Sequence, residues 1–430
     1  MIERIRELAA EMKPAMIDLA QRLIRTPSLS GQEKDVADLI LAELEKLGYD
    51  EVFRDPWGSV CGIIHGTEPG PAIMYNGHME HVDIGDPSEW HGYDPYGGVI
   101  DIDEMYNEAG DALEKTEVIH GRAAADTKSG IACQIYSGAI LAQLKKEGIG
   151  FKGDYMVSFV VMEEQIGIIG LIDNEFPKRG LHVDGVVSCE ATALKIYCGH
   201  RGRVEINVEV AGVTSHGASP WLGINAVNKA TKLIDAVEAY YAEHYQVDEK
   251  LGKSSIALTV INCTPGTMCI VPDRCNITYD RRLVPTETPE DAIAEIQAII
   301  DRLSAEDPDF HATVKVSAVP RTTYTGITET KPNIKEGWRI AEDHPFVAAA
   351  SNGLRSIGEP VSYGYWDFGT DLAMVSGRHH IASIGYSPMQ EYYCHRPVDK
   401  CRIDFMERAL VGNIAIFQEL TKLSGDDFKI

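Results

Sequence analysis

The fold class of this chain is decided by the stretch Asn76-Gly77-His78-Met79-Glu80-His81-Val82-Asp83-Ile84-Gly85-Asp86-Pro87. It follows the short apolar run 71–75, which predicts a buried strand. Two histidines and three acids then crowd into residues 78–86. Polar groups that directly follow a buried strand gather at the carboxyl edge of an α/β sheet. Because burying such a cluster is costly, its members must be solvated, paired or bound to a metal.

Two more apolar segments end in acids. Residues 155–162 form a run that ends in Glu163-Glu164, and residues 184–189 form another that ends in Glu190. Asp126 lies just before a segment with apolar residues at helical spacing. Strands that each deliver a histidine or carboxylate at their ends predict an α/β fold with a mainly parallel sheet and a site at its carboxyl edge.

The pattern of the chain changes near residue 200 and predicts two domains. Residues 204–210 alternate with period two, and the elements that follow have the order βαββαβ. This order predicts an inserted ferredoxin-like α+β domain at 200–324, within a first domain formed by 1–199 and 325–430. In the first domain, the polar and acidic residues 88–118 predict a long loop over the central cluster.

Composition excludes several classes of function. The chain has 430 residues and a net charge of −25, so neither nucleic acid nor an anionic membrane is expected as a partner. The sequence begins with an amphipathic, acid-containing helix, which differs from a signal peptide. Its nine scattered cysteines, without a C-x-x-C pair, favour neither a disulfide framework nor a thiolate zinc site. We expect a cytoplasmic protein.

The polar residues at the predicted sheet edge are two histidines and four acids: His78, Asp126, Glu163, Glu164, Glu190 and His395. Four carboxylates in one crevice cannot all stay ionised unless cations neutralise them. Imidazole nitrogen and carboxylate oxygen suit zinc, with manganese or cobalt as alternatives. Two metals can polarise a carbonyl and activate water, and a carboxylate that binds no metal can act as the general base.

At this point the sequence resembles the M20 family of dinuclear metallopeptidases and deacylases, which includes carboxypeptidases, dipeptidases, acetylornithine deacetylase and succinyl-diaminopimelate desuccinylase. Seven motifs run in the family's order along nearly the whole chain. They are Gly77-His78-x-Glu80-x-Val82, Gly121-Arg122-x-x-x-Asp126-x-Lys128, Glu163-Glu164, Glu190, Ser215-His216-x-x-x-Pro220, Asp280-x-Arg282-x-x-Pro285 and Cys394-His395-x-Pro397.

The resemblance implies a zinc-peptidase-like catalytic domain, an inserted dimerisation or lid domain, and a homodimer. It implies two divalent metal ions, with His78, Asp126 and Glu190 on one and with Asp126 bridging to a second. Glu164 and His395 would complete the second metal site.

The resemblance also implies roles for residues that do not bind metal. Glu163 would be the general base. His216 would cross the dimer interface to stabilise an oxyanion, and Arg282 would bind a substrate carboxylate. Glu80 takes the place of the aspartate that orients the first histidine in relatives. Cys269 and Asp399 are further departures, in place of asparagine and glutamate.

We therefore expect a metal-dependent hydrolase that cleaves an amide, peptide or N-acyl bond in a small molecule or short peptide with a free carboxylate. One alternative is a carbamoyl or ureido amidohydrolase with the same metal centre, which would release ammonia and carbon dioxide. The other alternative is a metal-binding pseudoenzyme that serves in oligomer assembly, which the substitutions at Glu80 and Cys269 favour.

Overall fold

The strand that carries the central stretch, β3 (Glu68–His78), lies in the middle of a nine-stranded sheet. The computed structural model describes residues 1–163 and 167–430. In spatial order, the other strands of this sheet are β1 (Glu51–Arg54), β2 (Val60–Ile64), β6 (Lys152–Val160), then β7 (Gly185–Ser188), β20 (Ser383–Gly385), β8 (Ile196–His200) and β18 (Trp338–Arg339), with β19 (Tyr363–Trp366) also paired to β8.

The parallel part of the sheet is its centre. Strands β6, β3, β7 and β20 pair in parallel, whereas β1, β2, β8 and β18 add antiparallel neighbours. The register sets His78 beside Val160, and Asn76 beside Ser188. Because parallel strands end at a common edge, the ends of β3, β6 and β7 deliver their polar residues to one place, as the sequence predicts.

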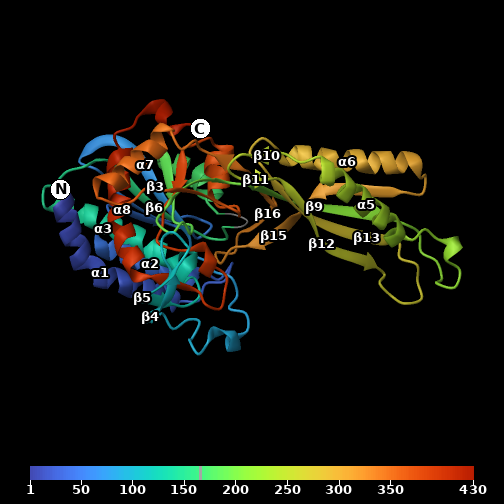
Figure 1. Ribbon diagram of the computed structural model, residues 1–430, viewed down its shortest axis with the longest axis horizontal. Coiled ribbons are helices and arrows are strands. Elements are labelled where there is room, and N and C mark those ends of the chain that lie inside the picture. Colours follow the sequence, from blue (N-terminus) through green and yellow to red (C-terminus); the bar gives the residue numbers. More distant parts are fainter. Residues whose placement is uncertain (164–166) are drawn as a thin grey trace.

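Helices cover this sheet (Figure 1). They are α1 (Ile2–Ile24), α2 (Lys34–Leu47), α3 (Ser129–Lys146), α4 (Phe176–Arg179), α7 (Pro345–Ser356) and α8 (Ile403–Leu420). Helix α3 packs against both α1 and α8, and it is buried almost along its whole length. Such a helix is apolar on nearly all sides. It begins at Ser129, three residues after Asp126, so the buried helix anchors the short segment that carries this carboxylate. No helix within the described ranges has both the length and the apolar character needed to span a membrane.

The prediction of a long loop at 88–118 is wrong for most of that range. Strands β4 (Val99–Tyr106) and β5 (Leu113–His120) form an antiparallel hairpin, which β21 (Lys400–Arg402) extends to three strands. Most residues of β4 are exposed or half-buried, so the strand lacks the apolar alternation that marks one buried face.

The second domain has the predicted βαββαβ order. Its elements are β9 (Gly202–Ala211), α5 (Ala226–Glu243), β12 (Ser255–Thr264), β13 (Arg274–Leu283), α6 (Pro289–Glu306) and β14 (His311–Val316). The strands lie in the order β12-β13-β9-β14 with antiparallel pairings, which is the ferredoxin-like arrangement. Alternate residues of β9 and β13 form a separate core with α5 and α6. The boundaries at 200 and 324 remain a prediction.

The second domain extends from one side of the first, which contains both chain termini (Figure 1). Two hairpins lie at the junction between the domains. They are β10 (Val247–Asp248) with β11 (Gly252–Lys253), and β15 (Ala318–Thr322) with β16 (Thr328–Pro332). The Tyr324 hydroxyl donates to the carbonyl of Gly58, and Lys250 pairs with Glu342. After the second hairpin, β17 (Ile334–Lys335) pairs with β9 before the chain returns to the first domain.

Candidate metal centre

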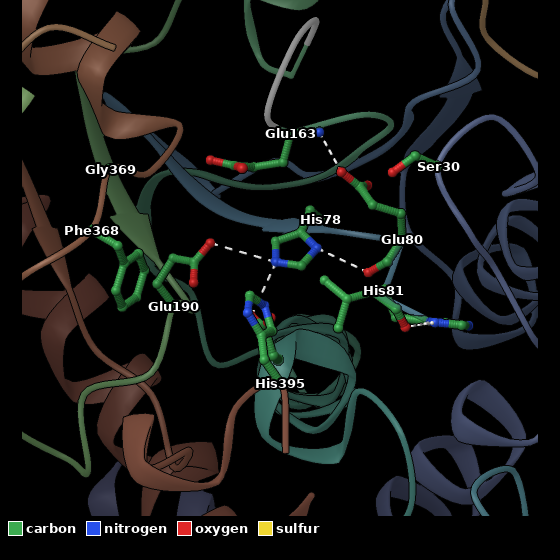
Figure 2. Close-up of a pocket in the computed structure, with 11 residues that line it drawn as sticks. Ser30, His78, Glu80, His81, Glu163, Glu190, Phe368, Gly369 and His395 are labelled. Carbon is green, nitrogen blue, oxygen red and sulfur yellow. Dashed lines mark hydrogen bonds and ion pairs between the residues drawn. The ribbon is translucent and has the colours of Figure 1, made fainter. Parts of the chain in front are cut away.

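A polar pocket lies at the carboxyl edge of the central strands (Figure 2). His78 ends β3, Glu190 follows β7, and Asp126 lies in the turn before α3. His395 comes from the segment before β21, late in the chain. The pocket, of about 120 Å³, is lined by Ser30, His78, Glu80, His81, Val82, Asp126, Glu163, Glu190, Phe368, Gly369 and His395. The structure thus brings together four of the five predicted metal ligands, and the fifth, Glu164, lies outside the described residues.

The four side chains meet around the carboxylate of Asp126. Its Oδ1 lies 3.2 Å from Nε2 of His78, and its Oδ2 lies 2.8 Å from Nε2 of His395. Oε1 of Glu190 lies 3.6 Å from the same Nε2 of His78. One ligand atom each from His78, Asp126 and Glu190 falls within 4.8 Å of the others. A carboxylate with an imidazole on each oxygen has the arrangement that a ligand bridging two metal ions requires.

The charges of this cluster depend strongly on one another. Burial, together with the Asp126 carboxylate, raises the pKa of Glu190 to about 8. Burial opposes ionisation of Asp126 too, but His78 and His395 outweigh it and hold the pKa of Asp126 well below its usual range. Burial disfavours protonation of His78, yet Asp126, Glu190 and Glu80 raise its pKa well above the usual value. A crevice with this excess of buried acids fits a divalent cation, and its nitrogen and oxygen donors fit zinc.

The orientation of His78 comes from a backbone group. Its Nδ1 lies 3.0 Å from the carbonyl oxygen of Glu80, so Nδ1 carries the hydrogen and Nε2 is left for a metal. The expected contact from the Glu80 side chain is not made. Instead, its carboxylate accepts a hydrogen bond from the backbone N–H of Glu163 (Figure 2).

The carboxylate of Glu80 is therefore hydrogen-bonded to the backbone of Glu163 and not to His78. Its second oxygen is buried and has no hydrogen-bond partner among the described residues. Burial is the main cause that raises the pKa of Glu80 to about 7, and the nearby Glu33 carboxylate adds to it, although the positive charge of His78 opposes the shift.

The turn that presents Asp126 is held by Asp399. This buried carboxylate accepts hydrogen bonds from the backbone N–H groups of Ala123 and Ala125, each at 2.8 Å, and from Nη1 of Arg122 at 3.1 Å. The network ties the Asp126 turn to the segment that carries His395. Arg122 and Asp399 are positions of the sequence motifs, but no local pattern predicts that they hold this turn.

Glu163 lines the pocket, and its carboxylate forms an ion pair with Lys335. Lys335 was missed at the sequence level. It lies 172 positions further along the chain, and no local motif links the two residues. Lys335 ends β17, a two-residue strand that pairs with β9 of the second domain.

His216 and Arg282 do not line this pocket. Strand β9 starts beside the first domain and runs outward for ten residues, or roughly 30 Å at about 3.3 Å per residue, before the His216 segment begins. His216 accepts a hydrogen bond at Nδ1 from the N–H of Ala218, which places its own hydrogen on Nε2. Arg282 pairs through Nε with Asp280 at 2.7 Å.

Comparisons with known proteins fit this fold and site. A family model described as the M20 peptidase dimerisation domain matches residues 198–308. The chain is 32% identical over 401 residues to the uncharacterised protein YgeY of Escherichia coli K12, covering 92% of each chain. It is 28% identical over 301 residues to succinyl-diaminopimelate desuccinylase of Corynebacterium glutamicum, covering 67% of this chain and 73% of that one.

Solved structures share the fold. Aminopeptidase PepT of Bacillus cereus has a TM-score of 0.68 at 18% identity, covering 95% of this chain and 98% of its own. The YXEP protein of Bacillus subtilis, described as a dinuclear metal binding peptidase from the M20 family, has a TM-score of 0.64 at 15% identity, covering 96% and 99%.

The chain belongs to the M20 family of metallohydrolases. The resemblance read from the motifs is confirmed. So is the enzyme class, a metallohydrolase acting on C–N bonds.

Proposed function

We propose that this chain hydrolyses an amide, peptide or N-acyl bond in a small substrate with a free carboxylate, using two divalent metal ions and Glu163 as general base. The observation that carries the proposal is the Asp126 carboxylate between His78 and His395, with Glu190 and Glu163 in the same pocket. The desuccinylase and peptidase relatives named above support this chemistry, and they do not favour the carbamoyl or ureido alternative.

In this proposal His78, Asp126 and Glu190 would hold one metal, and Asp126, His395 and Glu164 would hold the other. Zinc is the proposed ion because the donors are imidazole and carboxylate. When bound, two such cations supply Lewis acidity that polarises a carbonyl and acidifies water.

Glu163 takes the proton of the attacking water and delivers it to the leaving nitrogen, so the amide breaks into an amine and a carboxylate. Glu80 supports this step by holding the backbone of Glu163. Arg282 binds the substrate carboxylate, exchanging its present partner Asp280 for the substrate.

A homodimer is part of the proposal. Strand β12 forms one edge of the second sheet and exposes Leu258, Val260 and Ile261, with 38–48% of each accessible. An exposed apolar edge strand is a template for pairing with another chain. The His216 segment lies far from the pocket of its own chain, so its donor Nε2 would stabilise the oxyanion in the partner subunit's site.

We also propose a cytoplasmic location. All nine cysteines are free thiols, which suits a reducing compartment.

The test combines metal analysis with a substrate panel. Purified protein should contain about two metal ions per chain, as a dinuclear site requires. It should turn over one class among N-acyl amino acids, dipeptides and ureido acids. Release of ammonia from ureido acids alone would replace the proposed reaction with the ureido alternative.

The variant Glu163→Gln should keep the metal and lose about 10²- to 10⁴-fold in turnover, the range for a general base. Glu175→Gln, a buried glutamate that pairs with Arg179 and does not line the pocket, is the matched control. Turnover by Glu163→Gln equal to that of the control would remove Glu163 as the base.

A further inference from the structure

Lys335 lies where the chain passes from the second domain back to the first. It is the last residue of β17, where its Cα pairs with that of Arg203 on β9. Three residues later the chain enters β18, which pairs with β8 of the first domain. The backbone of Lys335 is therefore part of the second domain's sheet, while its side chain contacts Glu163 of the first domain.

The ammonium group of Lys335 contacts Glu163 at two points. Nζ forms an ion pair with Oε1 of the carboxylate and lies 3.5 Å from the backbone carbonyl oxygen of the same residue. The two side chains are 9% and 8% exposed, so water screens the pair little. Such a contact restricts the rotamers of the carboxylate more than an exposed pair would.

The path of the lysine side chain depends on Gly369. A Cβ built at Gly369 would lie 2.8 Å from Cδ of Lys335 and 3.2 Å from its Cβ. The absence of a side chain at Gly369 thus leaves the space that the lysine stem occupies. Gly369 also lines the pocket beside Glu163 (Figure 2).

Glu163 is therefore held from two sides. Glu80 accepts the hydrogen bond of its backbone N–H, and Lys335 binds its carboxylate. Glu80 follows β3 in the first domain, whereas Lys335 is paired to the first strand of the second domain. The direction of the carboxylate consequently depends on how the second domain sits on the first.

We propose that Lys335 is a positioning residue for Glu163, which it aims into the pocket and links to the placement of the second domain. This inference rests on the proposed function, in which Glu163 is the general base. In this role Lys335 acts on turnover through Glu163, the residue whose carboxylate it contacts. Misplacing a catalytic group by about 1 Å costs about 100-fold in rate. Loss of the contact that positions Glu163 should therefore produce a measurable loss of turnover.

The test compares Lys335→Met and Lys335→Arg with the native enzyme in kcat, KM, metal content and unfolding temperature. Lys335→Met should lose about 10- to 100-fold in kcat, with KM within about threefold and metal content unchanged. Lys335→Arg should restore most of the lost kcat, because it keeps a cation at that place. The matched control is Lys331→Met, since Lys331 lies on β16 and pairs with Glu329 instead.

A double variant separates this inference from the proposed function. If Lys335 acts through Glu163, Lys335→Met should cost nothing further in the Glu163→Gln background. An inactive Glu163→Gln with a fully active Lys335→Met would overturn the role of Lys335 alone. A fully active Glu163→Gln would overturn the proposed function itself. A raised KM with unchanged kcat, or loss of metal, in Lys335→Met would assign the lysine to substrate or metal binding and reject the positioning role.

Discussion

The carboxylate of Glu80 accepts a hydrogen bond from the backbone N–H of Glu163, which joins the end of β3 to the turn after β6. The contact needs the length of glutamate, since the backbone of residue 80 is already committed to Nδ1 of His78. The residue that departs from the family's pattern thus acts on the proposed general base, while its carbonyl oxygen orients His78, a proposed metal ligand.

Shortening this side chain should misplace the base. We expect Glu80→Asp to lower kcat about tenfold or more, because the carboxylate no longer reaches the N–H of Glu163. Metal content should stay unchanged, since the carbonyl of residue 80 still orients His78. Glu80→Gln is the control, because its amide oxygen can still accept the hydrogen bond. Native kcat in Glu80→Asp would show that this contact does not contribute to turnover.

Removal of divalent cations should lower the unfolding temperature by several degrees. Asp126, Glu190 and the two histidines are drawn together in a buried cluster, and a cation that binds only the folded state stabilises it by mass action. Differential scanning calorimetry with and without a chelator measures the shift, and added zinc should reverse it. The unfolding temperature of Asp126→Asn should change little when the chelator or zinc is added. Identical melting curves for the native protein in both conditions would argue against a structural contribution of the metal.

Mixing two inactive variants should restore activity. His216→Ala retains Glu163, and Glu163→Gln retains His216, so a mixed dimer contains one complete site if His216 acts across the interface. Random exchange of equal amounts should recover about one quarter of native turnover, because half of the dimers are mixed and each has one working site. The reference is the turnover of native protein mixed with each variant separately under the same exchange conditions. No recovery, despite subunit exchange shown by mass, would place both residues in the same chain's site.

Asp55 should make stability depend on pH. Its Oδ1 accepts hydrogen bonds from the N–H groups of Gly58 and Ser59, but its other oxygen is buried without a partner in the described chain. Burial is the main cause that raises its pKa to about 6. Between about pH 4 and 6 the folded state therefore holds a proton that the unfolded state has lost, and this contribution to stability falls as pH rises.

The variant Asp55→Asn keeps the accepting oxygen and cannot ionise. Relative to the native protein, it should gain about 1–3 kcal/mol of unfolding free energy between pH 4 and pH 7. Urea unfolding at both values measures the difference. Asp38→Asn is a surface control, since its exposed carboxylate pairs with Lys34. If the unfolding free energies of Asp55→Asn and the native protein differed by the same amount at pH 4 and pH 7, the assigned pKa would be contradicted.

The sequence was sufficient to predict that His78, Asp126 and Glu190 lie together, because each stands next to a strongly apolar segment. Strand ends of a parallel sheet meet by geometry, so three local patterns determine one site. The order βαββαβ could also be predicted from the sequence. One face of β9 and of β13 is buried, so their apolar residues alternate.

Other features depend on contacts that no local pattern records. The hairpin of β4 and β5 is largely exposed, and without a buried face its acidic residues resemble a loop. Glu80 was expected to contact His78 through its side chain, by analogy with aspartate, but the extra methylene carries the carboxylate past the ring to Glu163. Lys335 contacts Glu163 from a two-residue strand that pairs with β9 of the second sheet, and the two residues are far apart in the sequence.

The junction itself has a consequence for modularity. The chain leaves the nine-stranded sheet after His200 and next pairs with β8 again at Trp338, and these two residues are direct partners in an antiparallel pair. Their Cα atoms are therefore about 4.5–5.5 Å apart, a gap that a two-residue turn closes. The whole second domain is, in connectivity, a large insertion in the tip of a single β-hairpin. A gene encoding the first domain alone would need only a hairpin turn in its place, and a different module could be grafted at the same position without rerouting any strand of the catalytic sheet.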